Sequence, residues 1–328
     1  MTSRTRYFVI ASLLVLLIGL GSGLVAYYVG FPTSAFFAED GPADLQFVPP
    51  DAALVAYANV HEIMTSDLRA RARRALPRLP NGQEQFRNET GINVETDIDR
   101  VVACLSPSTE GGQGAGSAAL VLARGRFDAV RIESLMRDHG ANVGDHGGVR
   151  LITGAESSAH PGGLSLAFIE PGLVGVGSTS LVRSAIDLKN GGKSVTANDD
   201  IMRLVRSLDA GHAWAVGRFD ALASQAKLPG GVAAQLLPIT WFAASAHLNG
   251  GLRGVLRAET RDEASANNLR DVVRGFLALA RLQAGSRPDL RALVQSLDLG
   301  GTGTTVALSF NLPADVFDLL GAAVGQGL

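Results

Sequence analysis

The chain has 328 residues, which is longer than a typical single domain and is consistent with two domains of modest size. Its formal net charge of −2 gives no whole-molecule attraction to nucleic acid, whereas an apolar content of 46% is enough to bury a core. The single cysteine, Cys104, excludes an intramolecular disulfide. It lies in an apolar run that indicates a buried strand, so we expect a structural thiol there.

Residues 7–29 carry no charge and predict a transmembrane helix. At about 1.5 Å per residue, such a helix spans roughly 35 Å, enough for the hydrocarbon core of a bilayer. Arg4 and Arg6 precede it, and the next charged residue is Glu39. The positive-inside rule therefore places a tail of residues 1–6 in the cytoplasm and the bulk of the chain in the periplasm or outside the cell.

The alternative to this single-pass signal-anchor is a cleaved signal peptide, whose apolar region is usually only about 7–15 residues long. The small-residue sequence Gly21-Ser22-Gly23 is a poor cleavage site because it lies inside the apolar run. The sequence thus favours an uncleaved anchor. Gly19 and Gly23 form one GxxxG pattern, which could support helix dimerisation or could be a chance match.

Residues 30–50, with four prolines, predict a tether, and residues 51–209 a first domain. In chain order, we expect in the first domain a strand at 51–60, helices at 61–76 and 83–90, strands at 100–106 and 117–124, a helix at 128–139, strands at 149–153, 164–170 and 173–177, and helices at 181–188 and 199–208. The helix at 128–139 places Val130, Ile132, Leu135 and Met136 on one face.

Residues 210–328 predict a second domain that repeats this order. Its expected elements are a strand at 213–219, a mostly helical segment at 220–237, a hairpin of strands 241–248 and 252–260, a helix at 262–283 and a strand at 304–311. In both halves the second hairpin strand runs directly into a helix. The sequence therefore predicts an α+β fold of two similar domains from a tandem duplication, each an antiparallel sheet with helices on one face.

The first domain opens on Pro49-Pro50-Asp51 followed by an apolar strand, which approximates a Pro-x-Asp-x-x-x-strand signature. With the N-terminal anchor and the tandem layout, this resembles a group of bacterial membrane-anchored proteins with a tandem α+β extracytoplasmic region and no assigned activity. The resemblance implies a location and a layout, and it transfers no functional residue to this chain.

Two Asp-His pairs flank a glycine-containing turn and are the strongest candidate for a metal site. Asp138-His139 and Asp145-His146 repeat at a spacing of seven residues, and carboxylate and imidazole groups are ligands for divalent metals. The alternative is a polar loop whose charges face water. We expect the polar loop and no bound metal or cofactor.

Three glycine-containing segments are candidates for an anion or phosphate site. Residues 174–180 run from a strand into a helix, but they lack the third glycine of a dinucleotide fingerprint and also suit a simple helix N-cap. Residues 111–116 lack the Lys-Ser/Thr of a P-loop and predict a hairpin loop, and residues 300–303 predict a turn. No Gly-x-Ser-x-Gly nucleophile motif occurs, so the sequence shows no catalytic residues.

Five arginines without an acidic residue follow the anchor closely. Arg69, Arg71, Arg73, Arg74 and Arg78 could contact anionic lipid headgroups, since each basic charge near such a surface contributes about 1 kcal/mol. The alternative is a solvated helix face, because these side chains spread around the helix instead of sharing one stripe.

These patterns favour a non-enzymatic, extracytoplasmic binding or assembly protein with a protein partner in the cell envelope and no small-molecule ligand identifiable from a motif. One alternative is an enzyme, such as a hydrolase, whose site is assembled from residues distant in sequence. Another is a carrier of a lipid or other apolar ligand between sheet and helices. An apolar cavity in the folded domain is the observation that would favour the carrier.

Overall fold

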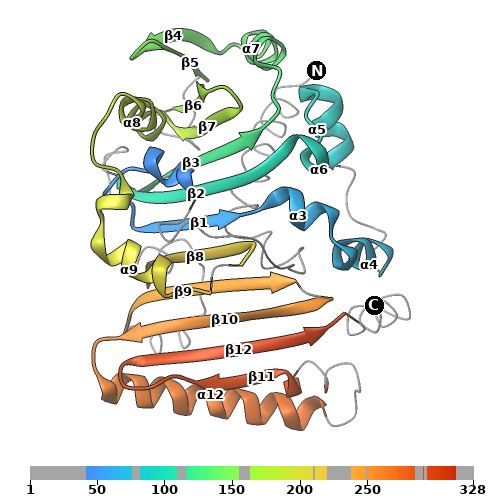
Figure 1. Ribbon diagram of the computed structural model, residues 1–328, viewed down its shortest axis with the longest axis vertical. Coiled ribbons are helices and arrows are strands. Elements are labelled where there is room, and N and C mark those ends of the chain that lie inside the picture. The colour runs from blue at the N-terminus through green and yellow to red at the C-terminus, as the bar shows by residue number, and fades with distance from the viewer. Residues whose placement is uncertain are drawn as a thin grey trace. The chain divides into compact units, whose positions relative to one another are not determined.

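The computed structural model describes residues 42–75, 82–108, 116–154, 163–209, 211–219, 238–248, 250–284, 291 and 294–314, and it confirms the α+β class (Figure 1). The predicted anchor at 7–29 and the predicted helical segment at 220–237 lie outside these residues. Within the described ranges, no helix combines the length and the apolar character needed to cross a bilayer. The described chain divides into two compact units, residues 42–64 and 82–203 forming unit 1 and residues 65–75 and 204–314 forming unit 2.

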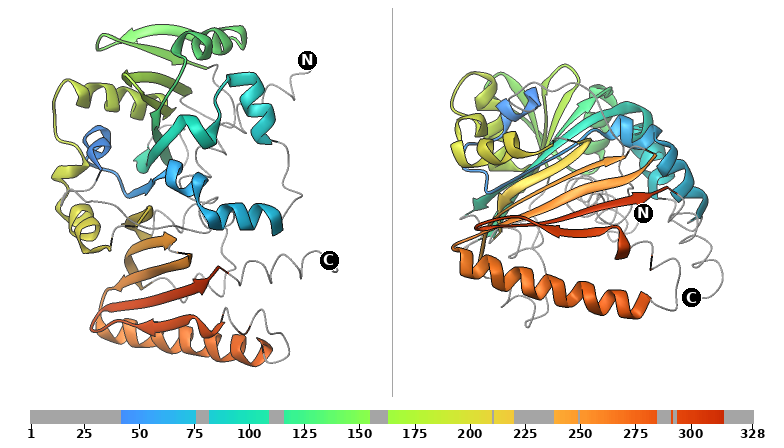
Figure 2. Two further views of the ribbon diagram at one scale, coloured as in Figure 1. Left: turned by 45° about the vertical axis from the view of Figure 1, so that its right-hand side comes forward. Right: turned by 60° about the horizontal axis from the view of Figure 1, so that its bottom comes forward.

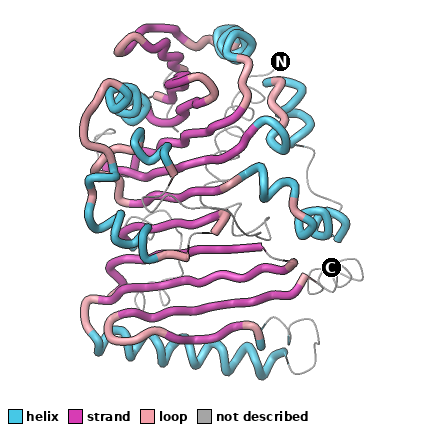
Figure 3. The backbone as a smooth tube through the Cα atoms, in the orientation of Figure 1, coloured by secondary structure: helices cyan, strands magenta, loops and turns pink. Residues whose placement is uncertain are grey.

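Unit 1 contains a seven-stranded run of sheet, whose strands are magenta in Figure 3. Its order is β1-β2-β3-β7-β6-β5-β4, and every neighbouring pair is antiparallel. The strands are β1 (Leu54–Ala58), β2 (Ile98–Ser108), β3 (Gly116–Gly125), β4 (Asn142–His146), β5 (Val149–Thr153), β6 (Leu164–Glu170) and β7 (Leu173–Ser178). Successive side chains of each strand point to opposite faces of this sheet.

Helices cover both faces of this sheet. The helical elements of unit 1 are η2 (Ala43–Phe47), α3 (Val60–Thr65), α5 (Gly82–Thr90), α6 (Val94–Asp97), α7 (Ala129–Asp138), α8 (Thr179–Lys189), η3 (Val195–Ala197) and the first part of α9 (Asp199–Ser207). Ala123 of β3 packs in the core cluster that includes residues of α5 and α7, whereas the next residue, Arg124, binds Asp44 of η2. Because successive strand residues point to opposite faces, α5 and α7 lie on one face and η2, with the neighbouring α8, on the other. The prediction of helices on one face is therefore wrong for unit 1.

The end of the predicted tether is packed against unit 1. Within residues 30–50, the described part begins at Pro42, and Leu45, Phe47 and Val48 are buried. The backbone N–H of Val195 donates to the carbonyl oxygen of Val48 at 2.8 Å. Residues 42–48 are thus part of the core on the η2 face.

Unit 2 contains an antiparallel run in the order β8-β9-β10-β12-β11. Its elements are α4 (Asp67–Ala75), β8 (Ala213–Arg218), β9 (Ile239–Leu248), β10 (Gly251–Thr260), α12 (Glu263–Gln283), β11 (Leu297–Gly300) and β12 (Thr305–Pro313). Figure 2 shows α12 lying along the strands, and its residues Ala266 and Leu269 form a core cluster with Val306 of β12.

The single helix predicted at 61–76 is two helices, α3 and α4. The backbone N–H of Arg69 donates to Oγ of Ser66 at 3.2 Å, an N-cap contact that begins α4 at Asp67. Leu68 of α4 is buried with Leu248 and Ala314 of unit 2.

Candidate functional site

A partly enclosed apolar cavity of about 70 Å³ lies in unit 1 between the sheet and helices α5 and α7. Its walls come from segments that are far apart in the sequence. They are Phe86, Thr90, Ile92, Ile98, Ala123, Phe127, Ile132, Leu135, Met136, His139, Leu166, Val174 and Val176. All of these residues belong to unit 1, so the site is complete within one unit.

Helical and strand periodicity together produce the apolar lining. On α7, Ile132, Leu135 and Met136 recur at the spacing that places side chains on one helical face. On β7, Val174 and Val176 are two residues apart and point to the same side of the sheet. The predicted face of α7 is thus largely confirmed, but Val130 is 81% exposed and does not contribute.

The two polar side chains in the lining are already bonded to the backbone. The hydroxyl of Thr90 donates to the carbonyl oxygen of Phe86 at 2.7 Å and accepts from the backbone N–H of Ile92 at 3.1 Å. His139 Nδ1 lies 2.7 Å from the carbonyl oxygen of Leu135, which can only accept, so this nitrogen is the donor. The cavity therefore suits hydrocarbon better than a polar ligand.

The size of the cavity limits what it can hold as it stands. A cavity of about 150 Å³ lined by aliphatic and aromatic residues holds benzene, and this one has roughly half that volume. It can hold the end of a hydrocarbon chain, whereas a longer stretch requires α7 to move outward. Such a movement would pull the buried Ile132 and the partly buried Met136 out of the core cluster of unit 1.

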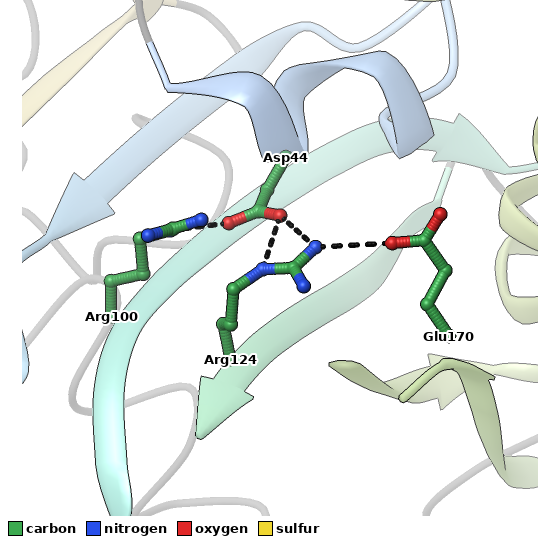
Figure 4. A network of polar contacts seen from close by, with 4 residues as sticks. All are labelled: Asp44, Arg100, Arg124 and Glu170. Atoms are coloured by element: carbon green, nitrogen blue, oxygen red, sulfur yellow. Dashed lines mark hydrogen bonds and ion pairs between the residues drawn. The ribbon is translucent and has the colours of Figure 1, made fainter. Parts of the chain in front are cut away.

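A charged network occupies the opposite face of the same sheet (Figure 4). The buried carboxylate of Asp44 accepts from Nε of Arg100 at 2.6 Å and from Nε and Nη2 of Arg124 at 2.8 and 2.5 Å. Arg124 also contacts Glu170 at 3.3 Å. The hydrogen bond to Asp44, aided by Glu170, raises the pKa of the Arg124 guanidinium above its ordinary value. Each charge has a partner, so this network fastens η2 to β2 and β3.

The structure does not bring the two predicted Asp-His pairs together as a metal site. His139 lies at the cavity, as described above, whereas His146 Nε2 pairs with Asp187 Oδ1 of α8 at 2.8 Å. His146 belongs to β4, so the expected polar loop is partly a strand. Among the described residues, no three His, Cys, Asp or Glu side chains lie close enough to hold a metal ion.

The glycines of the strand-to-helix segment are explained by packing. A Cβ atom on Gly177 would lie 2.1 Å from the carbonyl oxygen of Ala119 on β3. Ser178 Oγ accepts from the backbone N–H of the same Ala119 at 3.3 Å, and Ser178 is the N-cap residue of α8. Ser178 thus stands at the N-cap position of α8 without a side-chain cap hydrogen bond, and its hydroxyl binds β3 instead. In the 300–303 segment, Gly301 and Gly303 have positive φ values of 94° and 56°, as a turn requires.

The arginines predicted as a membrane contact are only partly described. Arg69 and Arg71 on α4 are half-buried. The side chains of Arg73 and Arg74 and the whole of Arg78 lie outside the description. Membrane contact through these five arginines stays a prediction.

No family model and no curated protein sequence matches this chain. Among solved structures, it is similar to crystal form I of TP0453, with a TM-score of 0.47 and 9% sequence identity. The alignment covers 86% of this chain and 97% of that one. A likeness at this level carries no argument about the present chain.

Proposed function

We propose that this chain is a membrane-anchored, extracytoplasmic and non-enzymatic binding protein. In this proposal, unit 1 holds the hydrocarbon part of an apolar ligand between α5, α7 and the sheet. The observation that carries it is the cavity, whose walls are apolar and whose two polar side chains are bonded to backbone groups. The anchor at 7–29 is the part of the proposal that rests on sequence alone.

The cavity favours the carrier over the other two functions considered. An enzyme needs polar groups directed at a reacting atom, and the cavity offers hydrocarbon instead. A protein partner would dock on an outer surface, which a cavity beneath α5 and α7 does not provide. Burial of alkyl surface supplies the affinity, at about 0.8 kcal/mol for each methylene group.

The test uses a fatty acid with a diazirine near the end of its chain, photoactivated in native membranes that contain the full-length protein. We expect label on peptides from α5 and α7, identified by mass spectrometry. The variant Ala123→Leu fills the cavity from β3 and should reduce that label to background. Ala119→Leu, on the same strand and outside the lining, is the matched control and should retain it. Equal labelling of all three proteins, or label spread evenly over both units, would overturn the proposal.

A further inference from the structure

His139 stands where helix α7 ends, in the wall of the apolar cavity. It is the C-cap residue of the helix, it is half-buried, and with Thr90 it makes up the polar part of the lining. Thr90 already donates its hydroxyl proton and accepts a hydrogen bond. His139 binds the carbonyl oxygen of Leu135 through Nδ1 alone, so its second ring nitrogen, Nε2, is the polar atom that the walls of the cavity leave to a ligand.

The Nε2 atom of His139 is accessible and makes no hydrogen bond or ion pair within the described part of the chain. The hydrogen bonds of this residue to other described residues run through Nδ1 and the backbone. Nε2 is also not one of the buried side-chain atoms that lack a hydrogen bond, so solvent reaches it. His146 differs, because its Nε2 is paired with Asp187. An apolar cavity with one polar atom of this kind suits a ligand that has a hydrocarbon part and one polar end.

The end of α7 does not depend on this ring. The carbonyl oxygen of Leu135 already accepts the backbone N–H of His139 at 3.2 Å, and the N–H groups of Gly140 and Ala141 bind carbonyl oxygens of the same helix at 2.8 and 3.0 Å. The bond from Nδ1 is therefore a second one to a satisfied carbonyl. What it does is orient the ring and hold a proton on Nδ1, which makes Nε2 an acceptor in the neutral ring and a donor in the charged ring.

We propose that the ligand of this cavity is a fatty acid whose carboxyl group binds Nε2 of His139. This inference rests on the proposed function, and it names the ligand class and the residue that binds its polar end. A carboxyl group suits Nε2 wherever their shared proton lies: the acid O–H donates to a neutral ring, and a charged ring donates to the carboxylate. The cavity of about 70 Å³ holds the methylene groups next to the carboxyl group, and a longer chain requires the outward movement of α7 described above.

The experiment compares two photoactivatable probes that share one diazirine-bearing alkyl chain. One probe is the free acid and the other is its methyl ester, which has neither a charge nor a proton to donate. Each is titrated onto purified full-length protein in nanodiscs, and mass spectrometry gives the concentration for half-maximal labelling of peptides from α5 and α7. The ratio of the two concentrations is the preference for the acid. Comparing this preference between variants cancels the partition of each probe into the bilayer.

Two substitutions at His139 separate head-group binding from the contact at the helix end. Asparagine places an amide nitrogen near the position of Nδ1, so His139→Asn can keep the bond to Leu135 while it removes Nε2. Glutamine places an amide near the position of Nε2, so His139→Gln keeps a group that binds the carboxyl end. His146→Asn, in the same unit and outside the lining, is the matched control.

We expect the unmodified protein to prefer the acid by about tenfold, since a hydrogen bond to a charged group contributes at least that factor. His139→Asn should lower the preference to about twofold or less, whereas His139→Gln should retain most of it and His146→Asn all of it.

Equal affinity of the unmodified protein for both probes would overturn the inference and leave the proposed function standing. So would a preference that survives in His139→Asn and disappears in His139→Gln, which is the pattern of a role at the helix end. If neither probe gave saturable labelling of α5 and α7, the proposed function would fail, and this inference with it.

Discussion

At the scale of single residues, the charged network at Asp44 is the contact that most clearly holds a distant segment in place. It joins Asp44 to Arg100 and Arg124, which follow it in the sequence by 56 and 80 positions. Removing one partner of a fully buried ion pair costs about 3–5 kcal/mol. Since the side chains of Arg100 and Arg124 are 35% and 23% exposed, we expect Asp44→Asn to cost unit 1 about 2 kcal/mol.

Hydrogen exchange of unit 1 peptides measures this loss, because both tryptophans, Trp214 and Trp241, lie in unit 2 and would not report it. Glu170→Gln is the control, since that carboxylate is 35% exposed and lies 3.3 Å from Arg124. We expect it to cost less than about 1 kcal/mol. Comparable effects of the two substitutions would contradict the assigned role of Asp44.

Cys104 gives a prediction about pH. Burial raises the pKa of its thiol from 9.0 to about 12. The folded state therefore binds the thiol proton more tightly than the unfolded state does. The protonated thiol contributes its full stabilisation below pH 9, and this contribution is lost as the pH rises toward 12. Replacing Cys104 with alanine should flatten this alkaline loss of stability.

Thiol labelling at pH 8 checks the same burial. Cys104 should react with a maleimide only after denaturation, whereas an added Val130→Cys should react in the folded protein. Fast reaction of the native thiol would show that the β1–β2 region opens readily.

At the scale of elements, the approach of β7 to β3 depends on Gly177. Because a Cβ atom there would lie 2.1 Å from a backbone oxygen, Gly177→Ala must displace one of the two strands. We expect a loss of roughly 1–3 kcal/mol or more, seen as faster exchange of the β3 and β7 amides. Gly144→Ala on β4 is the control, since its added methyl group would meet nothing within 4 Å, and it should change stability by less than about 0.5 kcal/mol.

Most elements could be predicted from sequence because their buried residues leave an apolar pattern, either a continuous run as in β3 or a helical spacing as in α7. The hairpin strands, α7 and α12 are examples. Strands β4 and β11 were missed because their residues are mostly exposed or half-buried, which leaves no apolar alternation. The cavity could not be predicted from the sequence, for a different reason. The apolar face of α7 could be recognised in the sequence, but β3 pairs with β7 through residues that are 49 to 57 positions apart in the sequence.

At the scale of the whole chain, the two units repeat one topology. In each unit, three strands that are consecutive in the sequence lie side by side and antiparallel. Next to the third of them lies the last strand of the unit, and beyond it the strand that precedes the last one in the sequence. The resulting orders are β1-β2-β3-β7-β6 and β8-β9-β10-β12-β11. In each, a helix follows the third strand. Unit 1 adds β4 and β5 beyond this pattern. We propose that this common order descends from the tandem duplication suggested by the sequence.

The proposed orientation in the membrane gives a prediction about access. In spheroplasts, a membrane-impermeant maleimide should label Val130→Cys on α7, because unit 1 would lie outside the cytoplasm. Thr5→Cys, in the tail of residues 1–6, should be labelled only after the membrane is disrupted. The reverse pattern, or labelling of both positions in intact spheroplasts, would contradict the orientation.

The attachment of η2 at Asp44 also has a mechanical consequence under the proposed topology. Fourteen residues lie between the end of the predicted anchor at 29 and Asp44, so a fully extended chain would reach about 50 Å from the bilayer. A pulling force along the tether would reach the ion pairs of Asp44 before it reached β1, which begins ten residues after Asp44. Arg100 and Arg124 would then pass this force to β2 and β3 inside the sheet, so that β1 is not the first strand to be loaded.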